Sequence, residues 1–167
     1  MRNRWSRMAL LGVIVAAAQA ASKDPASEMI AFIQEMKIYA AKRDPDFIII
    51  QQNAASLIDG HPEMTGVIDT IAQEAIWYDG SADVAWNNSD GYDWVNNSGL
   101  VSYYTGYLAQ YLAAGLPVFD CEYALNHASV AYTNAYDAGY IPYATRRSLS
   151  QLTTTPPPGY TSRSSSQ

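Results

Sequence analysis

Cysteine and histidine are both scarce in this chain of 167 residues, which has one cysteine, Cys121, and two histidines, His61 and His127. A single cysteine cannot form an intrachain disulfide, and this argues against a disulfide-stapled fold. The chain also has too few of either residue type for a cysteine-rich or histidine-rich metal centre. We therefore expect the protein to use no metal and no other cofactor.

Positive charge is scarce as well, because ten Lys and Arg residues stand against sixteen Asp and Glu residues, giving a net charge of −6. This balance argues against a broad basic surface for nucleic acid or for an anionic membrane. Charged residues make up 16% of the chain and apolar residues 49%, which is typical of a globular protein with a core. The chain is too short for a complete (β/α)8 barrel, which takes roughly 250 residues.

Tyrosine and tryptophan, by contrast, are abundant: the chain has 13 Tyr and 4 Trp residues against 3 Phe residues. These two side chains combine a flat apolar face with a polar group, which suits them to stack against sugar rings. Packing at half-exposed core positions is the alternative role, and we prefer it for most of the tyrosines.

The first 21 residues resemble a secretory signal peptide. Three arginines at positions 2, 4 and 7 precede the apolar run 8–18, and a small-x-small pattern follows at Ala18-Gln19-Ala20. The apolar run is well short of the ~20 residues that a membrane-spanning helix needs. We therefore predict a signal peptide over 1–21, an extracellular protein, and no membrane association after cleavage. The alternative is that 11–15 form a buried strand.

Strands and helices alternate through the rest of the chain. Asp24-Pro25 is typical of a helix start, and the helix is predicted to run to Arg43. The apolar, β-branched run that follows is typical of a strand buried on both faces, as in a parallel sheet. The whole pattern predicts strands over 47–53, 67–74, 117–123 and 139–143, helices over 98–114 and 126–138, a helical turn near 62–66 and a loop over 75–97.

This alternation favours an α/β fold with a parallel sheet, and we interpret it as about four βα units of a TIM-type (β/α) barrel, a half barrel. The barrel domain would span 22–152. The Pro/Ser/Thr-rich tail over 153–167 has too little apolar content to pack and is predicted to be disordered.

Polar residues occupy the carboxyl ends of all four predicted strands, where parallel α/β folds place their functional groups. Carboxylates, amides and tyrosines are what glycoside hydrolysis requires, because one carboxyl protonates the leaving oxygen while another activates water or attacks carbon. The residues are Gln52, Asn53, Gln73, Glu74, Glu122, Tyr123 and Tyr143.

Each of these candidates has a structural alternative. Glu74 could be an acidic residue at a helix N-terminus, and Asn53 could cap a turn. Strand alternation is expected to direct Asp120 and Glu122 to opposite sides of the sheet. The aromatic residues of the long loop could form a lid or substrate wall, or a buried packing cluster; they are Trp77, Tyr78, Trp86, Tyr92 and Trp94.

Four segments, in order, resemble successive motifs of glycoside hydrolase family 114. That family contains endo-α-1,4-polygalactosaminidases and related extracellular TIM-barrel proteins. Each motif alone is weak, but the four keep the family's order and a plausible spacing over about 26–152. They are Phe47 to Asn53, Ile68 to Glu74 before the aromatic pair Trp77-Tyr78, Pro117 to Ala124, and Gly139 to Ala144 with Arg146 following.

The resemblance implies that these segments are barrel strands five to eight, and that Glu74 is a catalytic carboxylate. The other polar and aromatic residues of the motifs would bind the substrate: Gln52, Asn53, Gln73, Trp77, Tyr78, Glu122, Tyr123, Tyr143 and Arg146. The family also has an Asp-Gly-x-x-x-Asp pattern on strand four, where this sequence has Gly12 to Ala17, and no acidic residue precedes Asp24. This departure predicts impaired catalysis in a truncated barrel.

Three functions remain open. The first is an enzyme that hydrolyses an amino-sugar polysaccharide of polygalactosamine type. The second is a carbohydrate-binding protein that keeps aromatic and amide groups but does not turn over. The third is an interaction protein that associates with a second copy through the open edges of a half barrel.

Overall fold

The computed structural model describes residues 24–80, 93–150 and 152–159. The predicted signal peptide, 1–21, lies outside these residues. None of the helices in the described part of the chain has the length and apolar character needed to cross a membrane.

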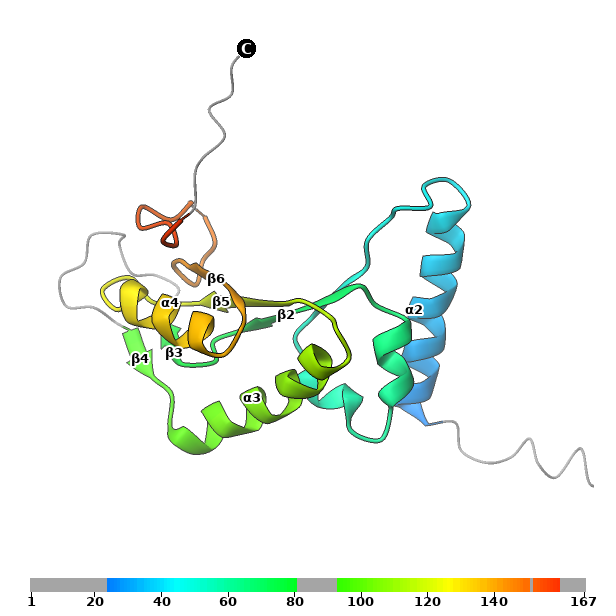
Figure 1. Cartoon of the computed structure of the whole chain (residues 1–167), viewed down its shortest axis with the longest axis horizontal. Coiled ribbons are helices and arrows are strands. Elements are labelled where there is room, and N and C mark those ends of the chain that lie inside the picture. The colour runs from blue at the N-terminus through cyan, green and yellow to red at the C-terminus, as the bar shows by residue number, and fades with distance from the viewer. Residues whose placement is uncertain (1–23, 81–92, 151, 160–167) are drawn as a thin grey trace, which may run out of the picture.

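A sheet of four parallel strands forms the centre of the fold (Figure 1). The strands are β1 (Ile50–Gln52), β2 (Thr70–Glu74), β5 (Val118–Glu122) and β6 (Ile141–Ala144), and they lie in the order β1-β2-β5-β6. All three neighbouring pairs are parallel. The α/β class with a parallel sheet is therefore confirmed; β1, β2 and β5 lie within their predicted segments, and β6 extends one residue beyond its segment, to Ala144.

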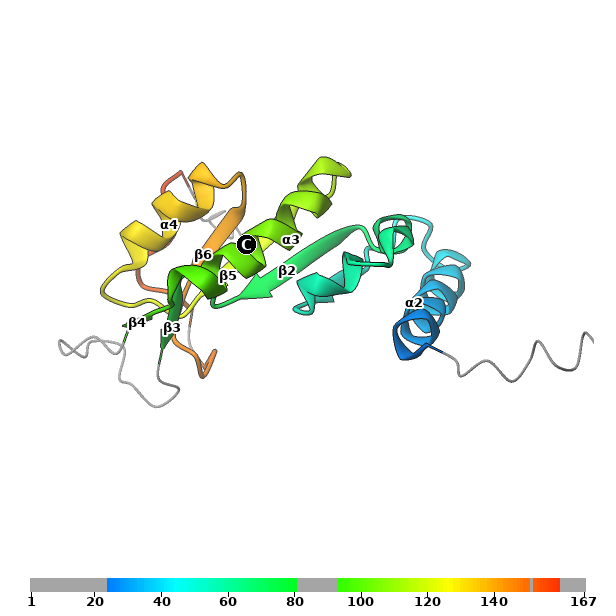
Figure 2. The same ribbon diagram turned by 90° about the horizontal axis from the view of Figure 1, so that it is seen from below.

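One helix precedes the sheet, and the other helices lie in the connections between its strands. The helices are α2 (Pro25–Ala41), α3 (Ser98–Ala113) and α4 (Ala128–Asp137), together with the 3-10 helices η2 (Ala55–Ile58) and η3 (Pro62–Gly66). Figure 2 shows α3 and α4 on the same side of the sheet, whereas α2 lies at the far end of the molecule.

Local capping signals explain where the helices begin and end. The Asp24 carboxylate accepts a hydrogen bond from the Ser27 N–H at 3.0 Å, with Pro25 in the first turn, as predicted. Asn97 caps α3 in the same way by accepting from the Leu100 N–H at 2.9 Å. Gly115 follows α3 with φ +84°, a left-handed conformation that favours glycine and ends the helix.

The core lies between the sheet and its helices. Ile71 and Val118 of the sheet are buried against Leu108 and Tyr111 of α3 and Ala135 of α4. Because successive strand residues point to opposite faces, each strand gives this core only every second side chain.

The opposite face of the sheet is open in part. Phe119 and Ile141, which are partners in the β5–β6 register, are 38% and 49% exposed. On the outer strand and the segment before it, Ile50 and Ile48 are 53% and 62% exposed. The prediction that 47–53 is buried on both faces was therefore wrong, since these two residues share one face of the chain and both are more than half exposed.

The segment expected to be one long loop contains an antiparallel strand pair. Strands β3 (Tyr78–Gly80) and β4 (Asp93–Val95) pair in the register Tyr78 with Val95. Trp86 and Tyr92, two of the predicted loop aromatics, lie outside the described residues. A Cβ at Gly80 would lie 2.5 Å from the Tyr123 carbonyl oxygen, so this close approach of two backbones requires glycine.

The first part of the tail contacts α4 and β6. The Thr153 N–H donates to the Tyr143 hydroxyl at 2.8 Å. The Tyr132 hydroxyl donates to the Thr155 carbonyl, and the Tyr136 hydroxyl donates to the Pro158 carbonyl at 3.0 Å. The remainder of the tail, 160–167, lies outside the described residues.

Candidate functional site

A cavity of about 400 Å³ lies at the carboxyl ends of β1 and β2. Four of the predicted site residues line it: Asn53, Gln73, Glu74 and Tyr123. The structure therefore brings together side chains from three different strand ends. The other lining residues are Ala54, Ala55, Ser56, Ala75, Asp79, Asn96, Leu100, Tyr103, Tyr104 and Arg147.

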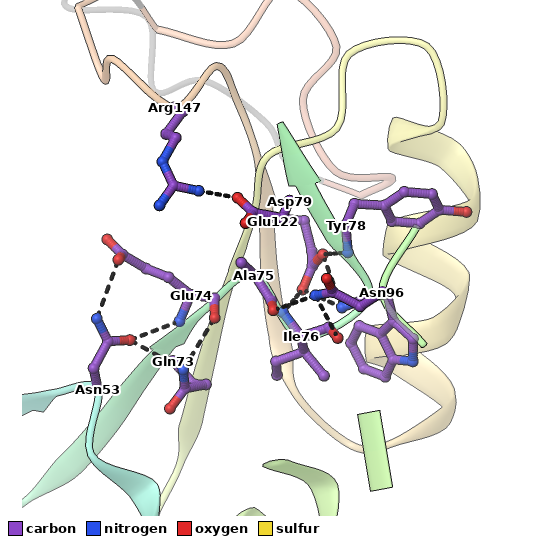
Figure 3. Close-up of polar contacts among 11 residues, drawn as sticks. Asn53, Gln73, Glu74, Ala75, Ile76, Tyr78, Asp79, Asn96, Glu122 and Arg147 are labelled. Atoms are coloured by element: carbon purple, nitrogen blue, oxygen red, sulfur yellow. Dashed lines mark hydrogen bonds and ion pairs between the residues drawn. The ribbon is translucent and has the colours of Figure 1, made fainter. Parts of the chain in front are cut away.

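Asn53 orients the Glu74 carboxylate (Figure 3). The Asn53 side-chain N–H donates to a Glu74 carboxylate oxygen at 3.1 Å. The Asn53 carbonyl oxygen accepts two hydrogen bonds, from the Glu74 backbone N–H at 3.0 Å and from the Gln73 side chain at 3.1 Å. These two donors fix the direction of the amide, so its own N–H group faces Glu74. Asn53 has φ 59°, a left-handed conformation that asparagine tolerates, so it also forms the turn after β1.

Tyr123 provides a second polar contact to Glu74. Burial raises the pKa of Tyr123, and a hydrogen bond to the negatively charged Glu74 raises that pKa further. The hydroxyl therefore keeps its proton at neutral pH and can donate a hydrogen bond to the carboxylate. The Arg147 guanidinium lies 5.2 Å from the centroid of the Tyr123 ring.

Asp79 and Arg147 face each other across the cavity as an ion pair (Figure 3). Sequence analysis missed both residues and assigned Arg146 to the site instead. Arg146 does not line the cavity, whereas its neighbour does. A local signal for Asp79 was present, since it directly follows the aromatic pair Trp77-Tyr78; the choice between two adjacent arginines had no such signal.

Glu122 lies beneath the site and not in its wall. Its side chain is 1% exposed and its carboxylate accepts from three successive backbone N–H groups. The distances are 2.7 Å from Ile76, 3.1 Å from Trp77 and 2.6 Å from Tyr78. We predicted a substrate contact, but the carboxylate is occupied by the backbone that connects β2 to β3.

Asp120 and Glu122 point to the same side of β5, so the prediction that they point to opposite sides was wrong. Residues two positions apart on a strand share a face, and both of these side chains are buried. Burial raises the pKa of Asp120 well above its usual value, and the nearby Glu122 charge raises it further. Burial also raises the pKa of Glu122, against the opposing effect of hydrogen bonds from the three backbone N–H groups. Both carboxyl oxygens of Asp120 are buried without a hydrogen-bond partner among the described residues, which favours the protonated form of Asp120.

The other predicted site residues lie away from the cavity. The Trp77 ring is 6.0 Å from the Tyr140 ring, and the Tyr78 ring stacks on His127 at 5.4 Å. These contacts correspond to the packing role that we left open for the loop aromatics. Gln52 is exposed at the end of β1, and the Tyr143 hydroxyl accepts from the tail, as described above.

The described residues contain no group of three or more His, Cys, Asp or Glu side chains that could hold a metal ion. The groups that line the cavity are an oriented carboxylate, a carboxylate–guanidinium pair, amides and tyrosines.

Comparisons with known proteins show what this chain resembles. No family model matches it. An uncharacterised protein of Deinococcus radiodurans is 33% identical over 128 residues, which are 75% of this chain and 38% of that protein. The glycoside hydrolase domain of PelA from Pseudomonas aeruginosa is similar in structure, with a TM-score of 0.56 and 18% identity over 76% of this chain and 47% of that one.

This chain thus spans less than half the length of either relative. The structural likeness shows the fold alone. Together with the four-stranded parallel sheet, it gives the chain a glycoside hydrolase-like α/β fold that is consistent with a partial barrel.

Proposed function

We propose that this chain is a glycoside hydrolase-like protein that binds carbohydrate in the cavity around Glu74. The observation that carries the proposal is the Glu74 carboxylate itself, which Asn53 orients inside a cavity whose lining includes Tyr104 and Tyr123. Oriented carboxylates and amides bind sugar hydroxyl or amino groups, and tyrosine rings stack on the apolar faces of sugar rings.

Charge favours an amino sugar as the ligand. Among the described residues that line the cavity, Glu74 and Asp79 are acidic and Arg147 is the basic one. Arg147 is engaged by Asp79, so the Glu74 charge is available to a ligand cation. A protonated sugar amine would supply that cation, which supports the polygalactosamine-type polysaccharide implied by the resemblance to family 114.

Binding is better supported than hydrolysis. Both stereochemical routes of glycoside hydrolysis require two carboxyl groups placed on either side of the scissile bond. Asp79 is the second carboxylate of this cavity, and its ion pair with Arg147 leaves it less available than Glu74. We therefore propose a protein that holds an amino-sugar polymer and hydrolyses it slowly or not at all.

The experiment is calorimetric titration with α-1,4-linked galactosamine oligosaccharides and with their N-acetylated counterparts. The wild-type chain should prefer the free amine, because N-acetylation removes the positive charge. Glu74→Gln keeps the shape of the side chain but removes its charge, so the preference should fall about tenfold or more, the scale of one charge-assisted hydrogen bond.

Glu35→Gln is the matched control, because Glu35 is exposed on α2 and does not line the cavity. It should leave the preference for the free amine unchanged. Absence of binding by the wild-type chain, or an equal preference in Glu74→Gln, would contradict the proposal. Reducing-end release from the same oligosaccharides measures hydrolysis, and rapid release by the wild-type chain would show that the cavity is a competent active site.

An extracellular location is the remaining part of the proposal, and it rests on the signal-peptide pattern over 1–21. N-terminal sequencing of the exported protein should begin at Ala21, after cleavage behind Ala20. Recovery of soluble cytosolic protein that still carries Met1 would argue against secretion.

A further inference from the structure

A cluster of tyrosines leads away from the cavity along α3. Tyr103 and Tyr104 line the cavity wall, and Tyr107 lies one helical turn further on. The rings contact each other edge to face, with centroids 5.5 Å apart for Tyr103 and Tyr104 and 5.0 Å apart for Tyr103 and Tyr107. These three residues are named the α3 tyrosine cluster.

Packing in the hydrophobic core does not explain the presence of a tyrosine at position 103. The buried residues of α3 are Leu108 and Tyr111, which pack beneath the sheet. Tyr103 is 47% exposed although it is a large aromatic residue at the rim of a cavity. An exposed aromatic surface beside a cavity is a common feature of ligand-binding sites.

The cluster is held in place from below. The Tyr107 ring packs against the hydrophobic core, and the charge of nearby Asp59, which follows η2, acts on its hydroxyl. Tyr107 in turn contacts Tyr103 edge to face, a geometry that aromatic pairs prefer. Two neighbouring rings therefore restrict the Tyr103 side chain before any ligand arrives, which lowers the entropic cost of using it for binding.

We propose that Tyr103, supported by Tyr104 and Tyr107, is a second carbohydrate subsite that stacks against a sugar ring lying outside the cavity. The proposal deepens the proposed function and rests on it. Its consequence is that the protein recognises a chain of sugars and not a single residue: one sugar lies at Glu74, and a further unit of the same chain lies on α3.

Chain length separates this role from a packing role. A subsite outside the cavity is reached by a long oligosaccharide and not by a short one. A ring that merely supports the cavity wall would affect ligands of every length to the same extent. The measurement is therefore the ratio of the dissociation constants for a galactosamine hexasaccharide and a galactosamine disaccharide, obtained by calorimetry.

Tyr103→Ala should weaken binding of the hexasaccharide about threefold to tenfold, the scale of one aromatic contact, and weaken binding of the disaccharide by a clearly smaller factor. Tyr103→Phe keeps the ring and should bind like the wild type. Tyr103→Leu keeps much of the apolar volume without the ring; it should lose the hexasaccharide advantage even if Tyr103→Ala proves unstable. Tyr39→Ala is the control, because Tyr39 is an exposed tyrosine of α2 that does not line the cavity.

Two results would overturn the subsite. One is an equal change at both lengths, and the other is no change in Tyr103→Ala or Tyr103→Leu while Glu74→Gln still loses the preference for the free amine. In both cases the proposed function stands and the subsite alone fails. If the wild-type chain binds neither oligosaccharide, the proposed function fails and the subsite fails with it.

Discussion

Replacing Glu122 by glutamine should destabilise the fold through the backbone that connects β2 to β3. The Glu122 carboxylate accepts from the N–H groups of Ile76, Trp77 and Tyr78 with both of its oxygens. Glutamine keeps one acceptor oxygen and places an NH2 group at the other position. At least one buried backbone N–H group then faces a donor in place of an acceptor.

The hydrogen bonds set the size of the effect. A buried N–H group that loses its acceptor costs about 1–3 kcal/mol, and the remaining bonds lose the strengthening that a charged acceptor gives. Glutamine is also neutral, so the folded state no longer buries a charge at this position, which offsets part of this cost. We expect Glu122→Gln to lower the free energy of unfolding by about 2–4 kcal/mol, a large share of the ~5–15 kcal/mol typical of a folded protein.

Urea denaturation followed by far-ultraviolet circular dichroism measures this change. Glu35→Gln, on the exposed side of α2, is the control and should change the free energy of unfolding by less than ~0.5 kcal/mol. A loss in Glu122→Gln as small as that of the control would refute the reasoning, because the carboxylate would then not be what holds the connecting backbone.

Three further predictions concern the buried acid, the backbone and the open surface. Burial raises the pKa of Asp120 well above 3.8, so the folded state binds a proton that the unfolded state releases, and stability should fall as pH rises from about 4 through the folded pKa. Asp120→Asn cannot titrate and should flatten this pH dependence of the urea midpoint; parallel curves for the two proteins would contradict it. Gly80→Ala should cost about 1–3 kcal/mol in the same denaturation assay, because the new Cβ would clash with the Tyr123 carbonyl oxygen, and an unchanged midpoint would show that the backbones separate freely. Exposed Ile48 and Ile50 beside the outer edge of the sheet should promote self-association, measured by light scattering and reduced by Ile50→Lys; a wild-type chain that stays monomeric at all concentrations would count against it.

Local signals were enough to predict most elements. The helix start at Asp24-Pro25 and the short turn over 62–66 depend on residues within a few positions of each other, and both agree with the structure. The strands were predicted from short apolar runs ending in polar residues, and the structure begins several of them later. The apolar run 47–53 shows why: its first residues have no neighbouring strand in the sheet, so a strand sequence was present without a strand partner.

Pairings between distant segments could not be predicted in the same way. β3 and β4 are three residues each and carry no alternating pattern long enough to identify, so their pairing across residues 81–92 had no local signal. The same holds for Arg147, whose place in the cavity depends on its ion pair with Asp79, a residue far away in the sequence. The sequence did contain a signal against the expected opposite orientation of Asp120 and Glu122. Residues two positions apart on a strand point to the same face, so both acids were bound to lie on one side of β5.

The position of Asp79 in the cavity depends on the buried Glu122 carboxylate. The chain leaves β2 at Glu74 and turns at Ala75, which has φ 51°, a conformation that costs energy for alanine. The Asn96 side chain holds the carbonyl groups of this turn, and Glu122 holds the three N–H groups that follow. The backbone is thereby fixed on both its donor and its acceptor groups, and it delivers Asp79 to the same cavity as Glu74. A substitution at Glu122 should therefore alter ligand binding without any contact between Glu122 and the ligand.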